Sequence, residues 1–416
     1  MSRRMFLAGL AAACLPIRVR AAADTPGVTA TTLKIGNTAP YSGPASAYGI
    51  IARTEAAVFK MINDQGGVGG RKIIYDSLDD GYSPPKTVDQ VRRLVEQDQV
   101  AFIFATVGTP TNTAIYRYTN GKHVPLIFLG SGANKWGDPR HAPWVMGWQP
   151  SYRTEAQIYT RYILQEKPEA RIGILYQNDD FGKDYPAGVR DVLGKDFDKR
   201  VVKVVSYETT DATIDSQAVA LQGSGADVLI SAATPKFAAQ IIRKIAELGW
   251  KPQHFMTNVS ISVGSVIRPA GEDNAKGLIS AAYLKDPTDP TWKDDAGMNQ
   301  WRAFMAKYMP DADITDGGTV FGYGVTMCLW EVLKQCGTDF SRPNIMKQAA
   351  NLHDVEIPVL LPGIKVSTSP TNFHPIRQMQ LTRWTGQHFE LFGKVLEGAS
   401  TQARPPPAVK QAVNRP

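Results

Sequence analysis

The sequence has 416 residues, which is too long for one ordinary core and suggests two or three domains. Apolar residues make up 43% of the chain and charged residues 20%, as in a globular protein. The formal net charge of +7 is modest and both signs are mixed along the chain, so the sequence lacks the basic stretch typical of nucleic-acid binding.

The first 23 residues have the pattern of a cleavable export signal. Arg3 and Arg4 precede a short apolar stretch, and an Ala-x-Ala site ends at Ala23. The apolar stretch is well short of the ~20 residues needed to span a bilayer, so we expect cleavage and not a membrane anchor. The paired arginines favour a twin-arginine signal over a general secretory one, whereas a lipidated Cys14 fits the sequence poorly. Cleavage removes four arginines, the net charge falls from +7 to +3, and the mature protein is expected in the periplasm.

From residue 32 to 258, apolar strand-like runs alternate with amphipathic stretches. We predict a helix over 48–65, which ends at two glycines, and another that begins at Ser83-Pro84-Pro85. The alternation predicts an α/β fold with parallel sheets covered by helices on both faces, and it occurs in two halves, 32–148 and 152–277. The predicted strands are 33–36, 71–75, 101–105, 126–129, 171–176, 201–207, 227–231 and 254–257.

Past residue 278 the pattern changes. Cys328 and Cys336 lie eight residues apart in one predicted helix, about 12 Å along its axis, which is too far for a disulfide. Both are expected to be buried as small apolar residues. The remaining predictions are a strand at 278–283, helices at 293–309 and 317–336, a hairpin of 377–384 and 388–392, and a disordered, proline-rich tail at 399–416.

Four turns that follow predicted strands are candidate ligand-binding positions. Open α/β sheets bind ligands at the carboxyl ends of their strands, where helices begin. The N–H groups at a helix start bind a carboxylate without a charged partner. Any one turn could be an ordinary connection, but two in each half favour a shared cleft. The turns are 106–110, 130–133, 177–182 and 232–235.

Sequence signatures of enzymes are missing. The chain has no P-loop, no His-Glu-x-x-His and no Gly-x-Ser-x-Gly, and its six histidines are scattered. We therefore predict no catalytic residue, no metal site and no cofactor. The paired acids Asp79-Asp80 and Asp179-Asp180 favour bonds to nearby backbone N–H groups over acid–base chemistry. A secreted hydrolase or oxidoreductase is the alternative from another class, and it would need a nucleophile and a base together in the cleft.

The segment 136–152 is dense in aromatic residues, namely Trp136, Trp144, Trp148 and Tyr152. Aromatic rings can stack on a ligand. Packing beneath a hinge is the interpretation that we favour for this segment as a whole.

Several stretches together resemble the Leu/Ile/Val-binding protein family. These proteins are type I periplasmic binding proteins that serve ABC importers, and the similarity covers about 30–393. The resemblance implies two Rossmann-like lobes with parallel sheets, joined by three crossovers, with the ligand cleft between them. It assigns 32–150 plus 279–357 to the first lobe and 151–278 plus 358–393 to the second. The stretches are Leu33-Lys34-Ile35-Gly36, Pro40-Tyr41-Ser42-Gly43-Pro44, Ile62-Asn63-Asp64-Gln65-Gly66-Gly67 and Tyr176-Gln177-Asn178-Asp179-Asp180-Phe181-Gly182.

The resemblance also implies binding residues. The first lobe would hold a ligand carboxylate, and the second lobe would close over it with an aromatic side chain. The first-lobe positions are Thr106, Ser131 and Ala133, with Tyr48 nearby, and the second-lobe positions are Phe181 and Thr234. The turns and stretches described above add Gly108, Thr109, Tyr152 and Asn258 to the candidate site.

Two departures from the family bear on the ligand. Amino-acid receptors of the family pair the ligand ammonium with an acidic residue on the second lobe, but here 257–260 reads Thr-Asn-Val-Ser. A buried ammonium without a partner would cost several kcal/mol. The aromatic alcohol expected at position 181 is also replaced by Phe. We therefore expect a carboxylate without an amine, such as an aromatic acid, with a branched-chain amino acid as the alternative.

The function that follows is a monomeric receptor that captures a small carboxylate by lobe closure and delivers it to an inner-membrane ABC permease. The alternative within binding proteins is a sensory module that feeds a membrane receptor.

Overall fold

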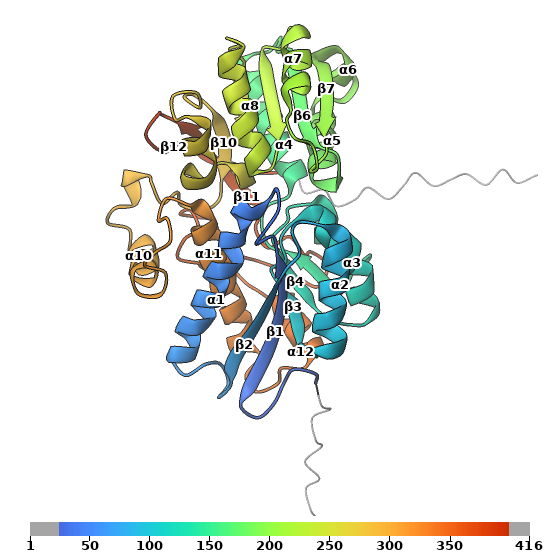
Figure 1. Cartoon of the computed structure of the whole chain (residues 1–416), viewed down its shortest axis with the longest axis vertical. Coiled ribbons are helices and arrows are strands. Elements are labelled where there is room, and N and C mark those ends of the chain that lie inside the picture. Colours follow the sequence, from blue (N-terminus) through green and yellow to red (C-terminus); the bar gives the residue numbers. More distant parts are fainter. Residues whose placement is uncertain (1–24, 399–416) are drawn as a thin grey trace, which may run out of the picture.

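The computed structural model describes residues 25–398, which form two lobes, each built on one β-sheet (Figure 1). The export signal expected at 1–23 and the tail expected at 399–416 lie outside the described residues. Within 25–398, no helix combines the length and the apolar character needed to cross a bilayer.

The first lobe contains a five-stranded sheet in the order β2-β1-β3-β4-β5, and every pairing in it is parallel. The central strands are buried and almost wholly apolar, as expected when helices cover both faces of a parallel sheet. The strands are β1 (Thr32–Ala39), β2 (Lys72–Asp79), β3 (Phe102–Phe104), β4 (Leu126–Leu129) and β5 (Val145–Gly147). The helices that connect them are α1 (Gly49–Asp64), α2 (Pro84–Arg92) and α3 (Thr109–Gly121).

The second lobe contains a seven-stranded sheet in the order β12-β11-β10-β9-β8-β6-β7. Strands β6 to β10 pair in parallel, whereas β11 runs antiparallel to β10 and forms a hairpin with β12. The strands are β6 (Ile172–Gln177), β7 (Val201–Tyr207), β8 (Val228–Ala232), β9 (Gln253–Met256), β10 (Ile279–Ala282), β11 (Gln378–Trp384) and β12 (Phe389–Glu397). Its helices include α4 (Tyr152–Glu166), α5 (Asp180–Leu193), α6 (Phe197–Arg200), α7 (Asp215–Gly223), α8 (Pro235–Glu247) and α9 (Arg268–Ala270).

The chain passes between the lobes three times. It leaves the first sheet after β5, returns to the first lobe after β10, and rejoins the second sheet at β11. On its return it forms α10 (Ala296–Tyr308), α11 (Gly317–Gln335) and α12 (Arg342–Ala349). Helix α11 packs on α1, and the Arg342 guanidinium at the start of α12 donates to the carbonyls of Val100 and Ala101. Figure 1 shows α11 and α12 in orange beside the blue first lobe.

One expected lobe boundary differs from the sheet pairing. Residues 279–357 were expected in the first lobe, but β10 at the start of this range hydrogen-bonds in the second sheet, between β9 and β11. The physical reason is that β10 is apolar and short, so its backbone groups are satisfied only inside a sheet. The crossover therefore follows β10 instead of preceding it.

Both cysteines of the described residues are free and buried, as the helical spacing predicted. Burial raises the pKa of each thiol to about 12. The fold is therefore held by its apolar cores.

Candidate functional site

A cavity of about 140 Å³ lies between the two lobes, at the carboxyl ends of both sheets. An engineered protein cavity of about 150 Å³ holds benzene, so this space suits a ligand near the size of one aromatic ring. The first lobe contributes residues that follow β2, β3 and β4, and the second lobe contributes residues that follow β6, β8 and β9. These lining residues include Tyr48, Tyr82, Gly108, Thr109, Gly130, Gln149, Tyr152, Phe181, Thr234, Asn258, Val259 and Phe321.

Seven of the ten candidate residues predicted from the sequence line this cavity, namely Tyr48, Gly108, Thr109, Tyr152, Phe181, Thr234 and Asn258. The other three, Thr106, Ser131 and Ala133, are buried behind the first-lobe wall. The Thr106 hydroxyl donates to the Asn112 amide oxygen. The Ser131 hydroxyl lies 2.7 Å from that of Thr109 and accepts from the Ala133 backbone N–H at 3.3 Å. Their short side chains therefore support Thr109 and the start of α3.

The start of α3 is open toward the cavity. Gly108 is its N-cap, and no side-chain cap is present. Pro110 has no N–H, so the donors of the first turn are the N–H groups of Thr109 and Thr111. Gly108 has a φ of +106°, and a Cβ atom there would lie 2.5 Å from the Tyr82 ring. Only glycine therefore allows both this backbone conformation and the close approach of Tyr82.

The start of α5 on the opposite lobe is closed by its own side chain. The Asp179 carboxylate accepts hydrogen bonds from the N–H groups of Phe181 at 2.9 Å and Gly182 at 3.2 Å. These bonds hold the Phe181 ring against Tyr152, with the ring centroids 4.7 Å apart. The acid at position 179 therefore bonds to backbone N–H groups, as the sequence predicted.

The acids at 79 and 80 behave in the same way. Asp79 accepts from the backbone N–H groups of Ser42 and Gly81, at 3.1 and 3.0 Å, and pairs with Lys86. Asp80 accepts from the N–H of Tyr82 at 2.9 Å, which places the Tyr82 ring at the cavity.

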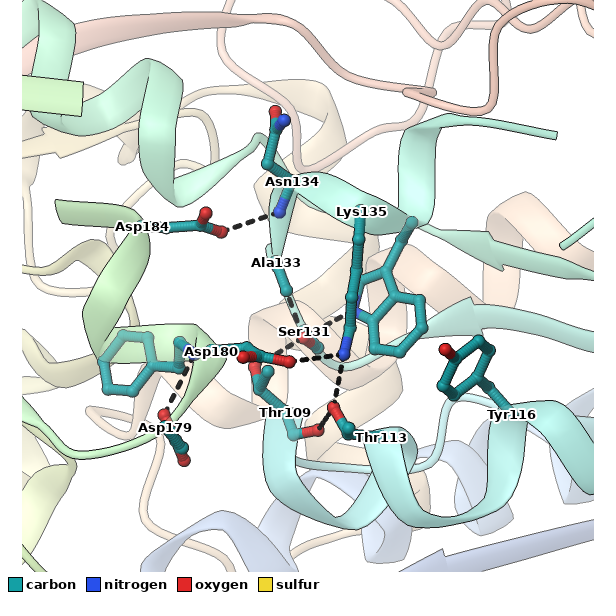
Figure 2. Close-up of polar contacts among 12 residues, drawn as sticks. Thr109, Thr113, Tyr116, Ser131, Ala133, Asn134, Lys135, Asp179, Asp180 and Asp184 are labelled. Atoms are coloured by element: carbon teal, nitrogen blue, oxygen red, sulfur yellow. Dashed lines mark hydrogen bonds and ion pairs between the residues drawn. The ribbon is translucent and has the colours of Figure 1, made fainter. Parts of the chain in front are cut away.

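Asn134 and Lys135 join the lobes through contacts with Asp184 and Asp180 (Figure 2). They lie in a short helical turn, η3 (Asn134–Gly137). The Lys135 ammonium lies 2.6 Å from an Asp180 carboxylate oxygen, and the Asn134 N–H donates to the Asp184 carboxylate at 2.7 Å. Burial raises the pKa of Asp184 to about 7. None of these four residues lines the cavity, so they connect the lobes without reaching the space for a ligand.

Hydroxyl groups join the lobes at another edge of the cavity. The Tyr48 hydroxyl, at the N-cap of α1, donates to the Val259 carbonyl at 3.1 Å. The Ser262 hydroxyl donates at 2.9 Å to Asp316, which caps α11. Burial raises the pKa of the Tyr48 phenol, so this group remains a neutral donor.

A buried acid, Glu155, lies behind the second-lobe wall. One carboxylate oxygen, Oε1, accepts from the Tyr159 hydroxyl and, at 2.7 Å, from the Asn258 backbone N–H. The other oxygen, Oε2, accepts from the Tyr185 hydroxyl at 2.7 Å and from the Asn258 side-chain amide at 2.5 Å. Burial raises the pKa of Glu155 to about 7. Both oxygens are therefore fully engaged by protein donors.

Among the described residues that line the cavity, Lys285 is the one lysine or arginine. Its ammonium lies 2.7 Å from Asp295 and donates to the Pro358 carbonyl at 2.9 Å. The cavity thus offers a ligand helix-start N–H groups, hydroxyls, amides and the carboxyl groups of Asp286, Asp289 and Asp316, and no unpaired cation. No group of three or more His, Cys, Asp or Glu residues within 25–398 is placed to hold a metal ion.

The aromatic residues of 136–152 divide between two roles. The Trp148 ring is fully buried and packs edge-on against Phe321, with centroids 5.2 Å apart, as expected for packing beneath a hinge. Tyr152 instead lines the cavity, and its hydroxyl accepts from the Gln149 amide at 3.1 Å.

Sequence reasoning missed Tyr82, Gln149, Glu155 and Phe321. Tyr82 follows a strand, so the rule about strand ends could have found it. Glu155 lies three residues after Tyr152 on α4, a spacing that places both on one helix face. Phe321 lies in an apolar helix, and nothing in the local sequence distinguishes it from a core residue.

Comparison with known proteins gives consistent results. The family model "Periplasmic binding protein" matches residues 32–388. A Leu/Ile/Val-binding protein homolog 7 from Brucella suis is 26% identical to this chain, and the match covers 62% of this chain and 65% of the relative. A Leu/Ile/Val-binding protein homolog 1 from Brucella abortus is 24% identical, and the match covers 73% of this chain and 79% of the relative. The chain therefore spans less than two thirds of the length of the first of these relatives.

Solved structures share the fold. A possible leucine/isoleucine/valine-binding protein from Rhodopirellula baltica has a TM-score of 0.77 and 21% identity, covering 89% of this chain and 98% of that one. A branched-chain amino acid ABC transporter protein from Thermus thermophilus with bound valine has a TM-score of 0.78 and 16% identity, covering 90% and 98%. These TM-scores show that the chain shares the overall fold of both proteins. The chain therefore belongs to the periplasmic binding proteins, as a type I member of the Leu/Ile/Val-binding family.

Proposed function

We propose that this protein is the receptor of an ABC importer and that it captures a small carboxylate without an amine, such as an aromatic acid. The observation that carries the proposal is the open start of α3, where Gly108 and Thr109 line the cavity and no side chain caps the helix. The N–H groups of such a helix start bind a carboxylate without a charged partner. The paired state of Lys285 leaves this helix start as the main anion-binding element.

The size and the walls of the cavity support an aromatic or branched apolar body. The cavity volume of about 140 Å³ is near that of a cavity that holds benzene. Tyr82, Tyr152 and Phe181 supply aromatic surface on both lobes. Edge-to-face contacts with such rings favour a planar ligand.

Two ligand classes compete with this one. A branched-chain amino acid is suggested by the valine bound to the Thermus thermophilus neighbour, but its ammonium would need an acid, and both Glu155 oxygens are engaged. The acids that line the cavity, Asp286, Asp289 and Asp316, each already accept from a backbone N–H group. A fatty acid is suggested by a neighbour described as a fatty acid ABC transporter substrate-binding protein from Thermomonospora curvata, with a TM-score of 0.74 and 19% identity over 90% of this chain and 95% of that one. The small cavity disfavours a long alkyl chain.

Capture would proceed by lobe closure. A ligand that contacts Thr109 on one lobe and Phe181 on the other stabilises the closed arrangement relative to an open one. The contacts of Lys135 with Asp180 and of Tyr48 with Val259 would add to that stability. The closed, monomeric form would then be recognised by an inner-membrane permease after export through the twin-arginine route.

A thermal-shift panel tests the ligand class. Benzoate- and cinnamate-type acids should raise the melting temperature more than leucine, isoleucine or valine. Strong stabilisation by leucine alone would refute the proposed ligand class. Small-angle scattering of the same samples should show compaction with a stabilising acid, and an unchanged radius of gyration would refute lobe closure.

A further inference from the structure

Asn258 stands between the cavity and a carboxylate that could bind an ammonium group. Its side chain is half-buried and lines the cavity, whereas Glu155 is completely buried and does not line it. Both the backbone N–H and the side-chain amide of Asn258 point at Glu155, one toward each oxygen. Glu155 is thus one residue removed from the space that a ligand would occupy.

The two oxygens of Glu155 differ in what protects them. At Oε1 the protecting groups are a backbone N–H and the Tyr159 hydroxyl, and no change of the Asn258 side chain removes either. At Oε2 the Asn258 amide, 2.5 Å away, acts together with the Tyr185 hydroxyl. Loss of the Asn258 side chain would therefore leave Oε2 with one donor fewer and open it toward the cavity.

An ammonium group gains little from the present arrangement, because the acids that line the cavity, Asp286, Asp289 and Asp316, already accept from backbone N–H groups. At Glu155 the cost to the ammonium group is higher. It would have to displace the Asn258 amide from Oε2 and lose its own hydration in the same step. A carboxylate at the α3 start bears no such cost, because the N–H groups there have no side-chain partner.

We propose that Asn258 determines specificity by shielding Glu155, so that the cleft excludes ligands that bear an ammonium group. The inference deepens the proposed function, since it names the residue pair that would separate carboxylates from amino acids. If Asn258 shields Glu155, then removing the Asn258 side chain should create a binding site for an ammonium group.

Three probes that share a phenylethyl body separate the groups involved. They are 3-phenylpropanoate, which has only the carboxylate, phenylalanine, which has both groups, and 2-phenylethylamine, which has only the ammonium. Thermal shift and calorimetry are measured for the wild type, Asn258→Ala and Asn258→Ser. The double variant Glu155→Gln/Asn258→Ala removes the acid as well, and Asn274→Ala removes an amide donor of the second lobe that lies outside the cavity.

We expect Asn258→Ala to bind 2-phenylethylamine, which the wild type does not, and to raise the affinity ratio of phenylalanine to 3-phenylpropanoate by about tenfold or more. Asn258→Ser should also bind 2-phenylethylamine and raise the affinity ratio, so the result does not depend on one variant folding well. The double variant should lose the gain, and Asn274→Ala should leave the ratio near its wild-type value.

The outcomes separate this inference from the proposed function. No binding of 2-phenylethylamine to either Asn258 variant would overturn the shielding, whether or not a carboxylate binds to the wild type. A gain that persists in the double variant would overturn it as well, because the gain would then not come from Glu155. Failure of the wild type to bind any carboxylate, with the amine gain intact, would instead refute the proposed function alone.

Discussion

The starts of α3 and α5 face each other across the cavity and are built in opposite ways. At α3 the N-cap is Gly108, which has no side chain, and the first N–H groups are left for another partner. At α5 the N-cap is Asp179, whose carboxylate takes the N–H groups of Phe181 and Gly182. The same local element, a strand followed by a helix, is thus open in the first lobe and closed in the second.

This difference indicates that the two lobes contribute different contacts to a ligand. In the proposed function, the first lobe would bind the anion through the uncapped start of α3. On the second lobe, Asp179 and Glu155 already accept hydrogen bonds from protein donors, and Phe181 and Tyr152 present aromatic surface. Each prediction below tests one side of this division.

The largest expected effect concerns the pH dependence of stability through Glu155. Its pKa rises from an ordinary 4.5 to about 7 in the folded protein, so the folded state holds the proton more tightly than the unfolded chain. Below pH 4.5 both states are protonated and Glu155 contributes nothing. Stability should fall as pH rises from about 4.5 to about 7, by at most about 3 kcal/mol, and stay low above that.

Chemical denaturation of the wild type and Glu155→Gln across this pH window measures that contribution. The substitution also changes hydrogen bonds. The comparison therefore uses the slope of the free energy of unfolding against pH, and not its absolute value. Other buried acids, such as Asp184, are present in both proteins and cancel in the difference. Identical slopes would mean that Glu155 does not titrate in this range.

Gly108→Ala tests the open helix start. A Cβ atom at φ +106° is strained and would lie 2.5 Å from the Tyr82 ring, so we expect a loss of about 2 kcal/mol in stability and a reduced affinity for the carboxylate. Gly121→Ala in the same helix is the matched control, since it has no neighbour within 4 Å and no positive φ. Equal melting temperatures for the two variants would contradict a special role for Gly108.

Sequence reasoning predicted the elements better than the contacts between them. Strands such as β3 and β4 are continuous apolar runs, and the start of α3 carries a Thr-Pro pair. Each of these elements could therefore be predicted from its own residues. Three predicted residues, Thr106 among them, lie behind the cavity wall, because the side of a turn that faces a ligand depends on the packing of the lobe.

The shielded acid could not be predicted for a related reason. Glu155 and Asn258 are 103 residues apart, and their contact depends on how α4 packs beside the end of β9. Residues 257–260 contain no acid, but Glu155 on α4 comes within hydrogen-bond distance of Asn258 in this segment. Pairing at long range likewise places β10 in the second sheet.

Asp179→Ala tests the closed helix start. The substitution removes the cap from Phe181 and Gly182 and should cost about 1 kcal/mol in the free energy of unfolding. It should also weaken ligand binding, because Phe181 loses the bond that positions it against Tyr152. Asp179→Ser retains a capping oxygen and should stay close to the wild type in denaturation experiments. A destabilised serine variant would show that the charge at 179, and not the cap, is what matters.

The smallest expected effect concerns the ion pair of Lys135 and Asp180, which joins the lobes outside the cavity (Figure 2). Lys135→Met should lower ligand affinity by roughly fivefold at most, because an exposed pair contributes no more than about 1 kcal/mol. Lys86→Met is the matched control, since Lys86 pairs with Asp79 inside one lobe, at 2.9 Å. Calorimetry at low and high salt should show the difference between the variants shrinking as salt screens the pair. If both variants lose the same affinity, the cross-lobe pair does not favour closure, and the division between the lobes rests on the two helix starts alone.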